Sequence, residues 1–286
     1  MFAESCSSLP RPRVGKSGSG AYTWYMDAMR TFLFLGTGTS VGVPMIGCEC
    51  AVCTSTNPRN NRTRSSVLLK LPAGNLLIDT TPELRVQFLR EKIPIAHAVL
   101  YTHYHADHLF GLDDVRLFPR KLGGSLPIYC TDDVEEVVRA TFSYAFHAQT
   151  ADLPAGILPK LEFRRITTAP FEVLGQRVTP IPLIHSRFDV LGFRIDNVAY
   201  CTDVSKIPDT SWPLLEGLDV LVLDALKPGI PNPAHLSVEQ ALQVVDRVKP
   251  RQTYFTHMGH EMDYDQLTRT LPAGVSPAYD GLQFLF

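Results

Sequence analysis

Short apolar runs recur along this chain, and several of them end in a histidine or an aspartate. Runs rich in β-branched and aromatic residues predict strands, because such side chains fit a half-buried pleated surface. The predicted strands are residues 30–36, 65–71, 76–79, 97–102, 127–130, 177–185, 198–203, 219–224 and 252–257, with a final strand pair in 278–286. Apolar residues at helical spacing predict helices at 82–92, 109–118 and 238–248. This mixture indicates an α/β protein.

The composition is that of a globular protein. Of 286 residues, 45% are hydrophobic and 20% are charged, which is ample for a core in one or two domains. A net charge of −2 gives no general attraction to nucleic acid. Residues 1–28 show no periodicity, so we expect a flexible extension, or an over-long gene start with Met26 or Met29 as the first residue. We assign residues 29–286 to one domain.

The motif His103-Tyr-His105-Ala-Asp107-His108 follows the predicted strand 97–102 and leads into the helix that follows it. Ordinary packing gives no reason to crowd imidazoles, which are costly to bury without partners. Histidine and aspartate in this spacing are typical of a metal site. His103 and His105 can point one way, while Asp107 and His108 point towards a second metal. Two metals a few ångströms apart would stabilise a hydrolytic transition state.

This motif resembles that of the metallo-β-lactamase-fold hydrolases. That superfamily completes its site with a later histidine, an aspartate and a final histidine at strand ends, and His185, Asp203 and His257 match these places. The resemblance covers residues 30–286 and implies an αβ/βα sandwich of two mixed sheets with outer helices. It implies one metal on His103, His105 and His185, a second metal on Asp107, His108 and His257, and Asp203 bridging both. A site rich in histidine and aspartate, without sulfur, tolerates zinc or manganese.

Three cysteines, Cys48, Cys50 and Cys53, form a Cys-x-Cys-x-x-Cys motif. A disulfide would leave one thiol over, whereas three thiolates and a fourth ligand would close a tetrahedral structural zinc site. His260, three residues after His257, is the best candidate for the fourth ligand. The resemblance to the phosphoribosyl cyclic phosphodiesterases of the carbon–phosphorus lyase pathway agrees with this zinc site. The alternative is three small buried cysteines.

The same subgroup resemblance implies a function. It rests on the cysteine site and the His-Met-Gly-His segment at 257–260, whereas the Leu-Gly-Thr-Gly loop at 35–38 resembles the wider branch that also includes ribonuclease Z. It implies hydrolysis of a phosphodiester, with a small cyclic phosphate expected, by attack of a hydroxide that bridges two metals. His235, just before the predicted helix 238–248, resembles a histidine that serves there as proton donor or transition-state stabiliser. Asp107, Asp203 and His235 are therefore the candidate catalytic residues.

Three alternatives stay open at this point. One is a ribonuclease Z-like RNA phosphodiesterase, although the chain has no long basic, glycine-rich arm. Another is an oxidative protein like the pyrroloquinoline quinone biosynthesis B protein, and the third is a zinc-binding module without activity. We expect a small phosphorylated substrate as partner, no nucleic acid and no membrane, since no apolar run approaches about 20 residues. A homodimer fits this subgroup. The thiolates and the lack of a secretory signal favour the cytoplasm.

Overall fold

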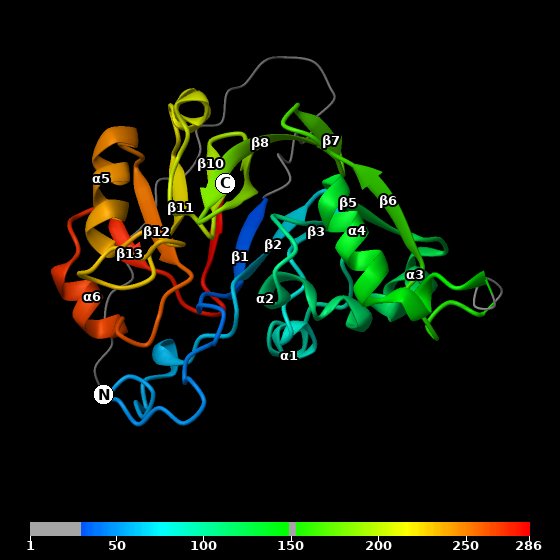
Figure 1. Cartoon of the computed structure of the whole chain (residues 1–286), viewed down its shortest axis with the longest axis horizontal. Coiled ribbons are helices and arrows are strands. Elements are labelled where there is room, and N and C mark those ends of the chain that lie inside the picture. Colours follow the sequence, from blue (N-terminus) through cyan, green and yellow to red (C-terminus); the bar gives the residue numbers. More distant parts are fainter. Residues whose placement is uncertain (1–29, 149–152) are drawn as a thin grey trace, which may run out of the picture.

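Two β-sheets packed face to face form the centre of the molecule in the computed structural model (Figure 1), which describes residues 30–148 and 153–286. Within this part of the chain, the strand order is β14-β1-β2-β3-β4-β5-β6 in one seven-stranded sheet. In the other seven-stranded sheet it is β13-β12-β11-β10-β9-β8-β7. Both sheets combine parallel and antiparallel pairs, for example β3 with β4 and β2 with β3. The predicted sandwich of two mixed sheets is confirmed.

The first sheet is built mainly from the N-terminal half of the chain. Its strands are β1 (Thr31–Gly36), β2 (Ser66–Leu71), β3 (Gly74–Ile78), β4 (Ala98–Leu100), β5 (Leu126–Cys130), β6 (Leu161–Arg165) and β14 (Gln283–Leu285). The strands of the second sheet are β7 (Phe171–Val173), β8 (Gln176–His185), β9 (Phe188–Ile195), β10 (Val198–Cys201), β11 (Val220–Asp224), β12 (Gln252–Thr256) and β13 (Val275–Pro277).

Helices cover the outer side of each sheet. They are α1 (Leu84–Arg90), α2 (Ala106–Leu109), α3 (Phe118–Leu122), α4 (Asp132–Thr141), α5 (Val238–Val248) and α6 (Tyr264–Thr270). In Figure 1, α1 to α4 lie on the side of the first sheet, and α5 and α6, in orange, lie on the side of the second. Helix α5 has the predicted bounds and begins with a capping box between Ser237 and Gln240. Short 3₁₀ helices, η1 (Pro58–Asn60), η2 (Leu112–Leu117), η3 (Ser143–Ala145) and η5 (Asp209–Leu215), complete the described elements.

Strands buried on both faces explain the continuous apolar runs of the sequence. In β1, Phe32 and Phe34 belong to the core between the sheets, whereas Leu33 and Leu35 pack towards the helices on the other face. In β11, Val222 faces the core between the sheets, and its neighbours face α5. Because side chains alternate between the faces of a strand, a strand covered on both sides is apolar at every position.

Two predicted elements differ from the structure. The predicted helix 109–118 is divided among α2, the 3₁₀ helix η2 and the start of α3, so Asp107 and His108 lie inside a helix rather than before it. The segment 278–286 contributes one strand, β14, which pairs with β1, and not a strand pair. The proposed extension at residues 1–28 lies outside the described residues.

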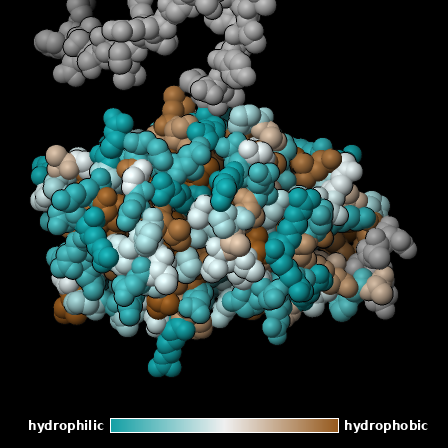
Figure 2. Space-filling model, turned by 90° about the horizontal axis from the view of Figure 1, so that it is seen from above, coloured by the Kyte–Doolittle hydropathy of each residue, from teal (hydrophilic) through white to brown (hydrophobic). Residues whose placement is uncertain are grey.

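The surface mixes polar and apolar residues. On the face seen in Figure 2, hydrophilic side chains in teal lie among scattered hydrophobic ones in brown. Such scattering is normal for a globular protein. No helix in residues 30–148 and 153–286 has the length and apolar character needed to cross a bilayer.

Candidate metal centre

The candidate ligands lie where neighbouring strands end. Strands β8, β10, β11 and β12 run in one direction, because β9 is antiparallel to both β8 and β10 while β10, β11 and β12 are parallel. Their carboxyl ends therefore meet at one edge of the second sheet. His185 ends β8, Asp203 follows β10 and His257 follows β12. The turn after β4 and helix α2 bring the remaining ligands to the same place.

Three of the strand-end residues adopt left-handed backbone conformations. The φ angles are +65° at Asp79, +55° at Asp203 and +56° at His257. Residues other than glycine pay of order 1–3 kcal/mol for such conformations, which persist where the surrounding structure enforces them and which cluster at functional sites. All three side chains lie beside His108.

His103, His105 and His185 form the first of two ligand groups. Each offers a ring nitrogen within 4.8 Å of the others. The His185 Nδ1–H donates to the Ala234 carbonyl at 2.6 Å, so the ring nitrogen Nε2 carries no proton and presents a lone pair. The Thr102 hydroxyl uses its only proton to donate to Asp79. The Thr102 oxygen must therefore accept a hydrogen bond from the Nδ1–H of His103, 3.0 Å away. His103 Nε2 then also presents a lone pair, and this atom is buried without a hydrogen-bond partner.

Asp107, His108, Asp203 and His257 form the second group, again with ligand atoms within 4.8 Å. His108 Nδ1 donates to Asp79 Oδ2 at 2.8 Å, which directs its Nε2 into the site. That Nε2 lies 3.2 Å from Asp107 Oδ2 and 3.0 Å from Asp203 Oδ2. Asp203 Oδ1 lies 3.3 Å from His257 Nε2 and 3.9 Å from His185 Nε2. Asp203 therefore faces both groups.

The electrostatics of the second group favour bound cations. Burial acts to lower the pKa of His108, but the carboxylates of Asp203 and Asp107 outweigh it and raise that pKa well above its ordinary value. Burial would raise the pKa of Asp203, yet His257 and His108 hold it well below its ordinary value. Buried carboxylates thus demand positive charge beside them. Protons on the histidines are one source, and divalent cations are another.

Orphaned buried nitrogens provide the test of whether metals fit. His103 Nε2, His108 Nε2 and both ring nitrogens of His257 are buried and make no hydrogen bond, although Asp203 oxygens lie 3.0 Å from His108 Nε2 and 3.3 Å from His257 Nε2. Leaving buried polar atoms unpaired is costly, so such atoms call for an explanation. Imidazole nitrogens and carboxylate oxygens that converge in two groups are a donor set suited to divalent metals. The residues present therefore fit divalent metal binding, as the sequence predicted.

His235 lies beside both groups. It stands in the loop between β11 and α5, with its ring centroid 4.7 Å from that of His185 and 4.5 Å from that of His257. Its Nδ1 donates to Asp224 Oδ2 at 2.8 Å. Asp224 is fully buried, and the same oxygen accepts from the Val204 N–H at 2.8 Å. The carboxylate thereby fixes the orientation of the His235 ring.

Sequence reasoning missed Asp224 as a site residue. The signal was present, because Asp224 ends an apolar strand as Asp79 and Asp203 do. A charge in such a run has little chance of being buried without a partner. Here the partner is His235, eleven positions further along the chain.

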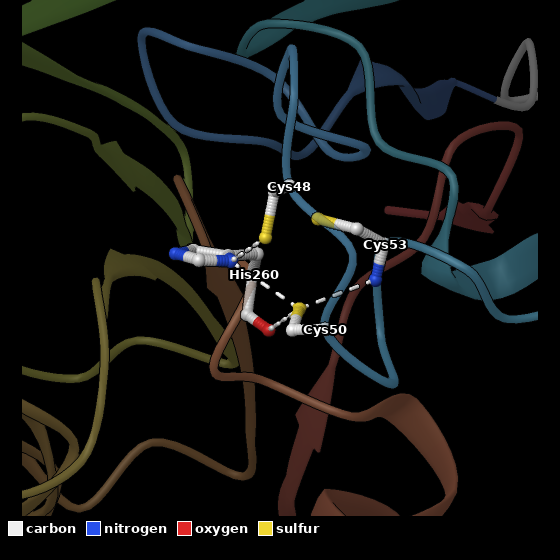
Figure 3. Close-up of side chains that lie close together, drawn as sticks. All are labelled: Cys48, Cys50, Cys53 and His260. Atoms are coloured by element: carbon white, nitrogen blue, oxygen red, sulfur yellow. Dashed lines mark hydrogen bonds between the residues drawn. The ribbon is translucent and has the colours of Figure 1, made fainter.

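The four candidate zinc ligands also meet (Figure 3). The Sγ atoms of Cys48, Cys50 and Cys53 and a ring nitrogen of His260 lie within 4.8 Å of one another. His260 Nδ1 is 3.2 Å from Cys48 Sγ and 3.4 Å from Cys50 Sγ. Ligands of a tetrahedral zinc with Zn–S of about 2.3 Å lie about 3.7 Å apart, so this cluster needs little movement to bind the ion. These cysteines are free thiols.

The local environment divides the thiols by acidity. The backbone N–H of Cys53 and the ring of His260 lower the pKa of Cys50 to about 6. Burial raises the pKa of Cys53 to about 11. A thiolate at Cys50 is the form that binds metals.

The loop that carries His257 and His260 is held by a buried arginine. Arg62 is 1% exposed, and its guanidinium donates to the carbonyls of Gly259 and Met262. The other arginines of this region also have structural partners, since Arg59 stacks on two tyrosine rings and Arg64 pairs with Glu83. Their contacts are those of a packed loop.

Comparison with known proteins agrees with this fold. A family model described as a β-lactamase superfamily domain matches residues 74–258. A crystal structure of a diphosphatase from the PhnP family superimposes with a TM-score of 0.83 at 41% identity, covering 90% of this chain and 97% of that one. Zinc-bound PqqB from Methylobacterium extorquens has a TM-score of 0.73 at 20% identity, covering 89% and 99% of the two chains. At this identity the likeness shows the fold alone.

Two further relatives complete the comparison. The short form of human tRNase Z has a TM-score of 0.66 at 16% identity over 89% of this chain and 98% of that one, which again shows the fold. An octanoyltransferase of Porphyromonas gingivalis (strain ATCC BAA-308 / W83) is 32% identical over 256 residues, 88% of this chain. This chain spans only 50% of that protein's length. From the family match over most of its fold, this chain belongs to the β-lactamase superfamily and has the metallo-β-lactamase fold.

Proposed function

We propose that this protein is a metal-dependent phosphodiesterase that uses two divalent cations, zinc or manganese, and prefers a small cyclic phosphate. The observation that carries the proposal is the position of Asp203, whose carboxylate lies 3.0 Å from His108 Nε2 in the second ligand group and 3.9 Å from His185 Nε2 in the first. A pair of neighbouring cations complements the anionic transition state of phosphoryl transfer. The 41% identical diphosphatase supports chemistry at a phosphoryl group.

The candidate ligands fall into two groups, one for each proposed cation. His103, His105 and His185 would hold one cation, and Asp107, His108 and His257 would hold the other. Asp203 would contact both. Bound cations would supply Lewis acidity and lower the pKa of water, so that a nucleophile exists near neutral pH. Asp79, by accepting from His108 Nδ1, fixes the tautomer of that ligand.

His235 would handle a proton. Its Nδ1–H bond to Asp224 leaves Nε2 as the atom available to the substrate. A proton added at Nε2 makes the ring cationic, and the buried Asp224 carboxylate stabilises that form. His235 would then stabilise the phosphoryl oxygens or give its proton to the leaving oxygen.

A small substrate fits the charge of the chain. With a net charge of −2, the protein offers no general attraction to a polyanion such as RNA. The oxidative and ribonuclease alternatives share the fold with this chain at 20% and 16% identity. Activity measurements separate these classes.

The test is hydrolysis of bis(p-nitrophenyl) phosphate with added manganese or zinc, beside p-nitrophenyl phosphate as the monoester. We expect metal-dependent cleavage of the diester and much weaker cleavage of the monoester, which carries more negative charge and lacks the second ester group. If fully metallated protein cleaves neither compound, the phosphodiesterase proposal is wrong. Cleavage of tRNA at low salt with no cleavage of small cyclic phosphates would favour the ribonuclease class.

The cysteine cluster leads to a separate proposal, that Cys48, Cys50, Cys53 and His260 hold one structural zinc. We expect Cys50→Ser to release about one equivalent of zinc, since a tetrahedral structural site needs all four ligands. The active-site metals should remain. Metal content of the purified protein, measured by mass spectrometry, checks this. Cys130→Ala is the matched control, because Cys130 lies in the core under α4, away from this cluster, and should keep the zinc. Unchanged zinc in Cys50→Ser would rule the site out.

A further inference from the structure

The hairpin between β8 and β9 has its tip beside the first ligand group. Strand β8 ends at His185 and β9 begins at Phe188, and these two residues are cross-strand partners. Ser186 and Arg187 form the turn, with a φ of +58° at Ser186. A turn this short leaves little freedom in the position of its flanking residues. The backbone position of Phe188 is therefore set by its pairing with His185.

Backbone contacts fix this hairpin on both sides. The Leu191 N–H donates to the Thr102 carbonyl at 3.1 Å, next to His103. The Ser186 N–H donates to the Ser205 hydroxyl at 3.0 Å, two residues after Asp203. The hairpin tip is thus tied to two of the loops that carry the candidate ligands.

Phe188 is an exposed aromatic residue at this tip. Its side chain is 41% exposed, although it is large and apolar. Its ring lies perpendicular to that of His105, with centroids 5.1 Å apart, and to that of Tyr104 at 6.1 Å. These contacts hold the ring in one orientation and leave part of it uncovered. An apolar surface kept open beside a candidate reaction site suits a ligand that covers it.

Arg187 adds an unpaired positive charge. It is exposed, and within residues 30–148 and 153–286 no carboxylate forms an ion pair with it. An exposed aromatic ring and an exposed cationic residue next to it in the chain suit a ligand that carries both a planar group and negative charge. A nucleotide has both features, since its base stacks on aromatic rings and its phosphate attracts a cation.

We propose that Phe188, with Arg187 beside it, forms a subsite for the nucleoside half of the substrate. The substrate class is then a phosphodiester of a nucleoside, whose base stacks on Phe188 while its phosphorus lies at the two ligand groups. This inference rests on the proposed phosphodiesterase activity and adds that the phosphodiester is esterified to a nucleoside.

Two esters that share the same leaving group test the proposed subsite. Thymidine 5′-(p-nitrophenyl phosphate) and methyl p-nitrophenyl phosphate both lose p-nitrophenol when water cleaves the P–O bond, and only the first retains a base. We expect Phe188→Ala to raise the ratio of KM values, thymidine ester over methyl ester, about tenfold, which corresponds to about 1.4 kcal/mol of lost stacking. Phe188→Tyr should restore the ratio. Calorimetric binding of thymidine 5′-phosphate should weaken by a similar factor in Phe188→Ala.

Control variants separate stacking from other causes. Phe110 is 52% exposed and is involved in no ring contact within the described residues, so Phe110→Ala should leave the KM ratio unchanged. Phe188→Leu keeps an apolar side chain, so a wild-type ratio in that variant would overturn base stacking. An unchanged ratio in a folded, metallated Phe188→Ala protein would also overturn the inference. If the wild-type protein cleaves neither ester, the proposed activity fails instead.

Discussion

Asp203→Asn is expected to abolish diester hydrolysis, with a fall in kcat/KM of at least about a thousandfold. A metal ion supplies several kcal/mol of transition-state stabilisation, and each 1.36 kcal/mol is a factor of ten in rate. Asp203 is the residue whose carboxylate faces both ligand groups, 3.0 Å from His108 Nε2 in the second group and 3.9 Å from His185 Nε2 in the first. Removing its charge would weaken both candidate metal sites at once. The bis(p-nitrophenyl) phosphate assay measures the loss.

Asparagine is the right replacement because it separates charge from backbone shape. Asp203 has a φ of +55°, a conformation that asparagine also tolerates. The variant should therefore fold, and metal analysis should show fewer bound ions. Asp246→Asn removes the charge of an exposed aspartate on α5 and should keep activity within about twofold, as surface substitutions usually have little effect. Near-normal hydrolysis by Asp203→Asn would mean that this carboxylate does not join two metals.

The sequence predicted the elements that local chemistry determines. Helix α5 has the expected bounds because its capping box and its apolar spacing are both local signals. Strands β1 and β2 were found because both of their faces are buried, which makes them apolar along most of their length. The end of the chain was misjudged. Its pairing partner, β1, is far away in sequence, and nothing within residues 278–286 indicates that a single strand returns to it.

Some ligands of the candidate site could be predicted from the sequence pattern alone, and others could not. His103, His105, Asp107 and His108 stand in one motif, so their common role can be read from spacing alone. His185, Asp203 and His257 are dispersed, and family resemblance was needed to select them among other strand-end residues. The structure brings all seven together, and chain topology explains how, since parallel strands end at one edge.

Other parts of the site carry no local signal. The bond from His235 to Asp224 depends on how the loop after β11 folds back over the sheet edge, which no short pattern encodes. Phe188 directly follows a two-residue turn, and its closeness to His105 depends on the packing of β9 against the loop after β4. An exposed phenylalanine is unremarkable in sequence, and only its neighbours give it meaning.

The second large expected effect is the loss of rate in His235→Ala, and its size should depend on the leaving group of the substrate. With a cyclic ribose phosphate, the leaving oxygen is an alkoxide that needs a proton, and general acid catalysis contributes about 10²- to 10⁴-fold. We therefore expect His235→Ala to lower kcat for this substrate by about a thousandfold. With bis(p-nitrophenyl) phosphate the leaving p-nitrophenolate needs little protonation, so the fall should be much smaller. Following product by phosphorus NMR for the first substrate and by absorbance for the second gives both rates.

Asp224→Asn tests whether the buried carboxylate acts through His235. Asparagine can still accept from His235 Nδ1, but it no longer stabilises a proton added at Nε2. We expect its rate loss to show the same leaving-group dependence, and the double variant to be no slower than His235→Ala, because residues that act as a unit are not additive. Metal content should be unchanged in His235→Ala. Equal losses on both substrates would assign His235 to stabilising the phosphoryl oxygens, and no loss on either would remove it from the catalytic residues.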